Sequence, residues 1–104
     1  MARWFSISPN GKKVVFQALG KLYIQDVKGS KARRLTRNRD VFEFYPAWSR
    51  DSKKIVYTTW NDNTLGTVRI QPVDGGGGQL LTREPGHYVE PVFSPNGSRV
   101  LYRK

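Results

Sequence analysis

Few side chains of the types that perform catalysis occur in this sequence, and they lie far apart. His87 is its only histidine, and Glu84 and Glu90 are the acidic residues closest to it. One imidazole and two carboxylates could ligate a zinc ion. A structural role for a single loop histidine is the simpler interpretation, and the absence of cysteine removes thiolate ligands. We predict no metal site here.

Other groups with reactive or cation-binding side chains also lack the partners that such chemistry needs. Ser8, Ser49 and Ser94 would each need a nearby base to act as a nucleophile, and one histidine cannot serve all three. Asp62 stands between two asparagines, but this spacing matches no calcium loop. The glycine run 75–78 is not followed by the lysine of a phosphate-binding loop. We predict no catalytic residue and no cofactor, so that the chain is not itself an enzyme, although it could be part of a larger one.

A strong excess of positive charge is the feature most suggestive of binding. The net charge is +10 and the pI is about 10.3. The candidate interaction surface combines the densest basic run with three polar or aromatic loop residues: Lys31, Arg33, Arg34, Arg37, Arg39, Trp60, Asp62 and His87. A solvated basic surface is the favoured interpretation. An anionic partner such as nucleic acid is a second interpretation, which the pattern does not favour.

The elements that would position these residues follow from a repeat. The turn Ser8-Pro9-Asn10-Gly11 recurs as Ser49-Arg50-Asp51-Ser52 and again as Ser94-Pro95-Asn96-Gly97, each time followed by basic residues and a β-rich run. A repeat of about 40–45 residues that contains strands is typical of β-propeller blades. We place the units at about residues 3–43, 44–88 and 89–104, in a single partial propeller spanning 1–104.

Four short strands are expected in each complete unit, from the β-branched and aromatic runs between turns. The expected strands are 5–7, 14–18, 21–27 and 32–36, then 46–48, 55–59, 67–73 and 79–82, then 91–93 and 100–102. A five-residue insertion around 60–66 is expected to form a loop in the second unit. The predicted fold class is therefore all-β, with two four-stranded blades plus the first two strands of a third, an incomplete propeller.

The aromatic and basic residues of the units are expected to have separate roles. Ile7, Trp48 and Phe93 are repeat-equivalent, and so are Phe16, Tyr57 and Tyr102, which indicates packing between blades. Trp4, Phe42, Phe44 and Tyr45 precede or begin first strands and should reach an adjacent blade or the channel mouth. Along 33–36, alternation should place Arg33 with Leu35 on one face and Arg34 with Thr36 on the other.

These motifs resemble the TolB-type β-propeller repeat, a relative of WD-type repeats. The resemblance lies in Tyr45-Pro46-Ala47-Trp48-Ser49, Lys54-Ile55-Val56-Tyr57, Leu81-Thr82 and the segment from Glu90 to Gly97, and it covers nearly all of the chain. The segments around Glu43, Trp60 and His87 are also similar to the propeller that precedes some bacterial amidohydrolase domains. The first unit departs from the pattern at Phe5, where the proline is missing, and the second departs at Arg50-Asp51-Ser52.

The resemblance implies a bacterial scaffold that binds protein partners and has no catalytic role of its own. It also implies a periplasmic location, although we expect no signal peptide in this sequence and no membrane span, since no apolar run approaches about 20 residues. The partner is expected to be another protein or the chain itself, as a homo-oligomer joined through exposed blade edges. The alternatives are an accessory propeller of a larger amidohydrolase or peptidase, and an anion-binding protein.

Overall fold

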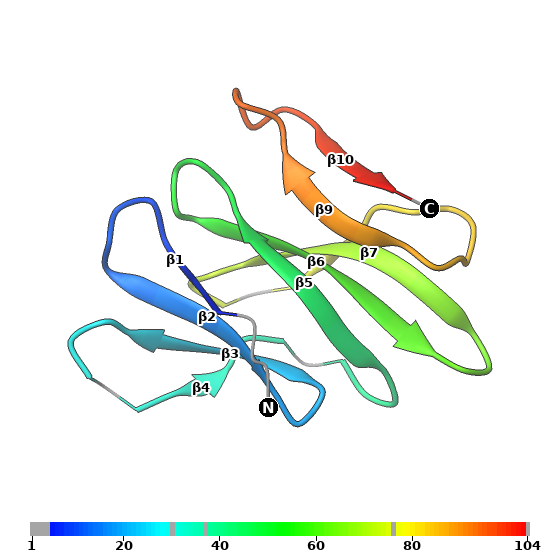
Figure 1. Ribbon diagram of the computed structural model, residues 1–104, viewed down its shortest axis with the longest axis horizontal. Coiled ribbons are helices and arrows are strands. Elements are labelled where there is room, and N and C mark those ends of the chain that lie inside the picture. The colour runs from blue at the N-terminus through cyan, green and yellow to red at the C-terminus, as the bar shows by residue number, and fades with distance from the viewer. Residues whose placement is uncertain (1–4, 30, 37, 76, 104) are drawn as a thin grey trace.

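The computed structural model describes residues 5–29, 31–36, 38–75 and 77–103, which form ten β-strands in three antiparallel sheets (Figure 1). The first blade contains β1 (Phe5–Ile7), β2 (Lys13–Ala18), β3 (Lys21–Asp26) and β4 (Arg33–Arg34). The second blade contains β5 (Phe42–Trp48), β6 (Lys54–Asn61), β7 (Leu65–Pro72) and β8 (Gln79–Leu80). The third unit pairs β9 (Val89–Phe93) with β10 (Val100–Arg103).

The predicted all-β class, with two four-stranded blades and two strands of a third, is confirmed. Trp4 and Arg37 lie outside the described residues, and the unit boundaries at 43 and 88 stay a prediction.

The sheets stack face to face, with one apolar core between each neighbouring pair. Val15, Leu22, Ile24 and Leu35 of the first blade pack against Ile55, Tyr57, Val73 and Trp48 of the second. Residues of β6 alternate between the two cores, because Val56 turns to the opposite face and packs with Tyr88, Phe93 and Val100 of the third unit. The predicted packing role of Trp48, Tyr57 and Phe93 is what the structure shows.

The first strands of the second blade and the third unit extend further toward the N-terminus than expected. Each contains an irregularity at a residue that precedes proline: Tyr45 has φ 54° and Glu90 has φ 50°. The register of β5 with β6 shifts between Phe44 and Ala47. A β-bulge of this kind lets pairing continue past a proline that cannot donate a ladder hydrogen bond. The expected starts of these strands at the prolines are therefore wrong, and the strands begin at Phe42 and Val89.

Two other segments differ from the expected pattern. The insertion around 60–66 does not form a separate loop; it lengthens the β6–β7 hairpin, in which Trp60 pairs with Gly66 and Asn61 with Leu65. The fourth strand of the first blade is only Arg33–Arg34. Because β4 ends there, Leu35 and Thr36 are both buried instead of alternating.

Candidate functional site

The predicted interaction residues fall into two groups on different parts of the molecule. Lys31, Arg33 and Arg34 lie along the outer strand of the first blade, whereas Arg39 precedes Asp40, whose carbonyl accepts a hydrogen bond from Asn61 of the β6–β7 hairpin. All four cations are exposed. Arg37 lies outside the described residues. Trp60, Asp62 and His87 belong to the second blade and the segment that follows it. The structure therefore does not bring the predicted residues together in one site.

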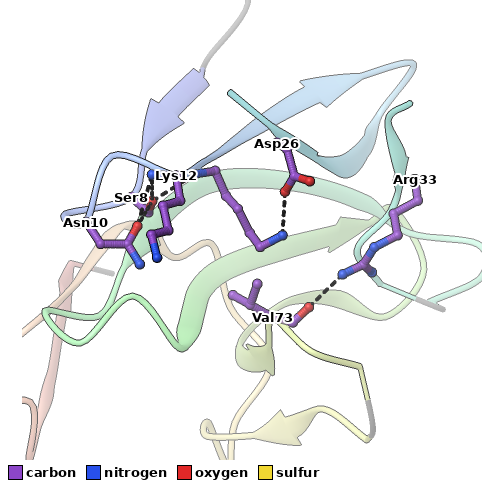
Figure 2. A network of polar contacts seen from close by, with 7 residues as sticks. Ser8, Asn10, Lys12, Asp26, Arg33 and Val73 are labelled. Atoms are coloured by element: carbon purple, nitrogen blue, oxygen red, sulfur yellow. Dashed lines mark hydrogen bonds and ion pairs between the residues drawn. The ribbon is translucent and has the colours of Figure 1, made fainter. Parts of the chain in front are cut away.

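Part of the basic run has a structural role. Arg33 donates from Nη2 to the carbonyl of Val73 in the second blade, at 2.8 Å (Figure 2). Arg34 donates more weakly to the Thr36 hydroxyl and the Asn38 carbonyl, both at 3.4 Å. These guanidinium groups tie the outer strand to its surroundings. Their positive charge still faces solvent.

Trp60, Asp62 and His87 form a cluster at the tip of the β6–β7 hairpin. The indole Nε1 of Trp60 donates to Asp62 Oδ1 at 2.8 Å, and the rings of Trp60 and His87 lie 5.3 Å apart. Trp60 and Asp62 also line a cavity of about 410 Å³, together with Lys21, Asp40 and Phe42. The described part of the chain contains no group of three or more His, Cys, Asp or Glu side chains that could hold a metal ion. The hairpin cluster is therefore an aromatic and polar surface.

The three repeat-equivalent serines hold their turns together through their hydroxyl groups. Ser8 Oγ donates to Asn10 Oδ1 at 2.6 Å and accepts from the amides of Lys12 and Lys13 (Figure 2). Ser49 and Ser94 bond in the same way to Asp51 and Asn96, at 2.6 and 2.8 Å. Every hydroxyl is thus used within its own turn, which agrees with a structural role.

Asp51 occupies the position that asparagine holds in the other two turns. Its Oδ1 accepts from the Ser49 hydroxyl and from the Lys53 amide, and these hydrogen bonds hold the pKa of the carboxyl below its ordinary value of 3.8. The carboxylate therefore stays ionised at neutral pH, and a proton on it would weaken the turn only in acid.

One polar residue between the blades was not singled out from the sequence. Glu43, at the start of β5, has no exposed surface, and its carboxylate accepts from the Leu22 amide at 2.7 Å, the Thr36 hydroxyl at 2.5 Å and the Asn38 amide at 2.9 Å. Asn38 also donates to the Tyr57 hydroxyl at 2.7 Å. A charged residue inside a strand otherwise made of aromatic and apolar residues is the signal that could have identified it.

Burial at this interface changes the acidity of Tyr57. Desolvation raises its pKa above the ordinary value of 10.0, partly offset by the hydrogen bond from Asn38. A raised pKa in the folded state means that this group supports folding fully below pH 10.0 and loses that support as the pH rises through the folded pKa. The tyrosine remains neutral at physiological pH and serves the interface by packing.

Among the described residues, one face of the first blade has no neighbouring blade. Register pairs Phe5 with Phe16, Ile7 with Val14, and Phe16 with Tyr23, so these side chains share the face turned away from the second blade. The rings of Phe16 and Tyr23 stack there at 5.7 Å, while Phe5 and Ile7 are exposed. We call this surface, made of Phe5, Ile7, Val14, Phe16 and Tyr23, the open face.

The sequence of these blades is similar to parts of two kinds of known protein. No family model matches the chain. Dipeptidyl-peptidase 5 of Porphyromonas endodontalis is 32% identical over 108 residues, covering 94% of this chain and 15% of the relative. TolB of Francisella tularensis is 27% identical over 89 residues, covering 83% of this chain and 20% of the relative. In both cases the chain spans only a small part of the curated relative.

A solved structure agrees with the sequence matches. TolB of Acinetobacter baumannii superposes with a TM-score of 0.79 and 28% identity, over 96% of this chain and 26% of that one. The chain consists of TolB-type β-propeller blades. A TolB-named structure from Agrobacterium tumefaciens, 24% identical with a TM-score of 0.77, has the same fold. The TolB-type repeat explains why the serine turns, the bulges before proline and the interblade aromatic residues recur in register. In the described residues no helix is long and apolar enough to cross a membrane.

Proposed function

We propose that this chain is a non-catalytic scaffold that binds protein through the open face of its first blade. The observation that carries the proposal is the repeat itself. Ile7, Val14 and Phe16 correspond to Trp48, Ile55 and Tyr57, which in the second blade pack against the blade before it. The open face therefore has the composition of a blade interface, and Ile7 is nevertheless 57% exposed. Exposed apolar surface of this kind is typical of a protein-binding site.

The occupant that fits this face is the third unit of a second copy. Val92 and Leu101 pair across β9 and β10 and point away from the second blade. They correspond to Ala47 and Val56, the residues through which the second blade contacts its successor. A contact between this surface and the open face joins two different surfaces, and such heterologous contacts extend into rings or filaments. Because the contact joins separate copies of the chain, we expect the association to depend on protein concentration.

Light scattering after size-exclusion chromatography tests self-association. Ile7→Glu places a charge in the open face without disturbing a buried residue, so we expect it to abolish concentration-dependent growth in mass. Leu19→Glu is the matched control, since Leu19 is exposed on the β2–β3 turn and lies outside the open face. A wild-type chain that stays monomeric at every concentration would overturn self-association. Equal effects of the two substitutions would show that the open face is not the contact.

A second candidate function is that of an accessory propeller segment in a larger bacterial hydrolase. It is favoured by the match to dipeptidyl-peptidase 5, which covers 94% of this chain but only 15% of that relative. The amidohydrolase variant of this proposal rests on the motif resemblance around Glu43, Trp60 and His87. Reading the gene beyond both ends of this sequence tests it. A neighbouring domain with a serine triad or a metal-ligand set would support the hydrolase role, and an open reading frame without one would contradict it.

A further inference from the structure

The three serine turns lie next to one another along one end of the stacked sheets. Figure 1 shows the β1–β2, β5–β6 and β9–β10 turns in succession at corresponding ends of their sheets. Two hydrogen bonds join them: the Asn10 amide donates to Ser52 Oγ at 3.1 Å, and Arg50 Nη1 donates to the Pro95 carbonyl at 3.1 Å. We call residues 8–13, 49–54 and 94–99 the turn row. Because each turn is closed internally and linked to the next, the turn row is a preformed surface.

The turn row concentrates positive charge. Exposed cations are contributed by all three turns: Lys12, Arg50, Lys53, Lys54 and Arg99. Within these three ranges Asp51 is the only acidic residue, and its carboxylate already accepts from the Ser49 hydroxyl and the Lys53 amide. At the same end Asp26 of β3 pairs with Lys13 of the first turn. The opposite ends of the strands are more balanced, since Asp40, Asp62 and Glu84 lie there with Lys21, Arg39 and Arg83. The excess charge of the protein is therefore directional, which favours docking of an anionic partner on one end.

The turn row is also hollowed between its second and third turns. A cavity of about 460 Å³ lies there, and its lining includes Arg50, Lys54 and Asn96 together with Asp51, whose carboxylate is bonded within its own turn. The bond to the Pro95 carbonyl holds the guanidinium of Arg50 in place and leaves its other nitrogen donors available. A cation held at a fixed position, with an asparagine side chain nearby, is suited to receiving a carboxylate.

We propose that the turn row docks an acidic segment of a partner polypeptide, with Asp or Glu carboxylates meeting Arg50, Lys53 and Lys54. Sequence-tolerant binding of single-stranded nucleic acid uses aromatic platforms for base stacking. The three ranges of the turn row contain no aromatic residue, and Phe93, which lines the cavity, packs against the core between the second blade and the third unit. This favours a carboxylate partner over a nucleic acid. This surface is separate from the open face of the first blade, and docking on it does not require self-association.

Fluorescence anisotropy with a labelled polyglutamate peptide tests this proposal on the full chain. A single-stranded oligonucleotide of matched charge and an uncharged Gly-Ser peptide serve as comparison probes. We expect polyglutamate to bind at low salt, more tightly than the oligonucleotide and with an affinity that falls as salt is added. The double substitution Lys53→Glu/Lys54→Glu should weaken binding by about tenfold or more.

The control is Arg39→Glu/Arg83→Glu, which changes the net charge equally at the opposite end of the sheets. Binding by this variant within about twofold of wild type supports a localised site. Equal loss in both double variants would show that net charge alone attracts the peptide, and would overturn the proposal. Tighter binding of the oligonucleotide, or no binding of polyglutamate, would overturn it as well. Circular dichroism of both variants verifies that the fold is retained.

Discussion

Glu43 shows how a single residue can distinguish two interfaces that share one architecture. Between the first and second blades the amide of Leu22 donates to the Glu43 carboxylate. At the repeat-equivalent place between the second blade and the third unit, the Val68 amide donates at 3.2 Å to the hydroxyl of Thr82. Tyr88 stands where Glu43 would be, and its ring packs edge-on against Tyr102 at 5.1 Å. The same backbone donor is thus satisfied by a buried charge at one interface and by a neutral hydroxyl at the other.

Replacing Glu43 should therefore be costly. Glu43→Ala leaves the Leu22 amide and the Thr36 hydroxyl buried without their acceptor, and we expect a loss of about 3 kcal/mol in the free energy of unfolding. Urea unfolding followed by tryptophan fluorescence measures it. Glu90→Ala is the control, because Glu90 is exposed and pairs only with Arg103 at the surface, where such a pair contributes less than about 1 kcal/mol. A loss for Glu43→Ala no larger than that of the control would contradict the assigned role.

At the scale of elements, the lengthened β6–β7 hairpin connects the second blade to the third unit. Gly66, near the start of β7, exchanges backbone hydrogen bonds with Gly86 at 2.8 and 3.2 Å. A β-carbon on Gly66 would lie 2.5 Å from the Gly86 carbonyl oxygen and 2.6 Å from that of Thr59. The close approach of two backbones at this point requires the absence of a side chain.

The substitution Gly66→Ala should separate these backbones and destabilise the hairpin. We expect a loss of about 2 kcal/mol, since the clashing atoms belong to the main chain and cannot rotate away. Thermal unfolding by circular dichroism is the measurement. Gly77→Ala is the matched control, because a β-carbon there meets no atom within 4 Å and we expect little change. A stability of Gly66→Ala equal to that of Gly77→Ala would show that the hairpin tolerates separation from the following segment.

Sequence reasoning was most successful where an element repeats. The serine turns and most strand positions were predicted from local motifs that occur in all three units, and the predicted blades are confirmed. Features without a local sequence signal were missed. The bulges at Tyr45 and Glu90 need a positive φ that neither residue type indicates, and the partners of Glu43 lie up to 21 residues away along the chain. The single five-residue insertion had no second copy to show that it extends a hairpin.

At the scale of the whole molecule, the stack of blades has a different exposed face at each of its two ends. Each inner face is matched by its neighbour, whereas the open face of the first blade and the outward face of the third unit have none among the described residues. Propellers ordinarily bury such faces by closing about 4–8 blades into a ring. Both end faces are exposed among the described residues, and their sequences carry the residues of an interface.

Substitutions at repeat-equivalent positions should therefore change the free energy of unfolding by different amounts, according to the place of the residue in the stack. Val56 is 0% exposed and Leu101, its counterpart, is 58% exposed. We expect Val56→Ala to cost about 2 kcal/mol at any protein concentration, because it leaves a cavity between the second blade and the third unit. Leu101→Ala should have almost no effect in dilute solution. At concentrations where copies associate, it should lower the melting temperature relative to wild type, because the outward face is then buried against an open face. Calorimetry over a concentration series separates these outcomes. If Leu101→Ala is neutral throughout while wild type still self-associates, the contact between copies lies elsewhere on the molecule.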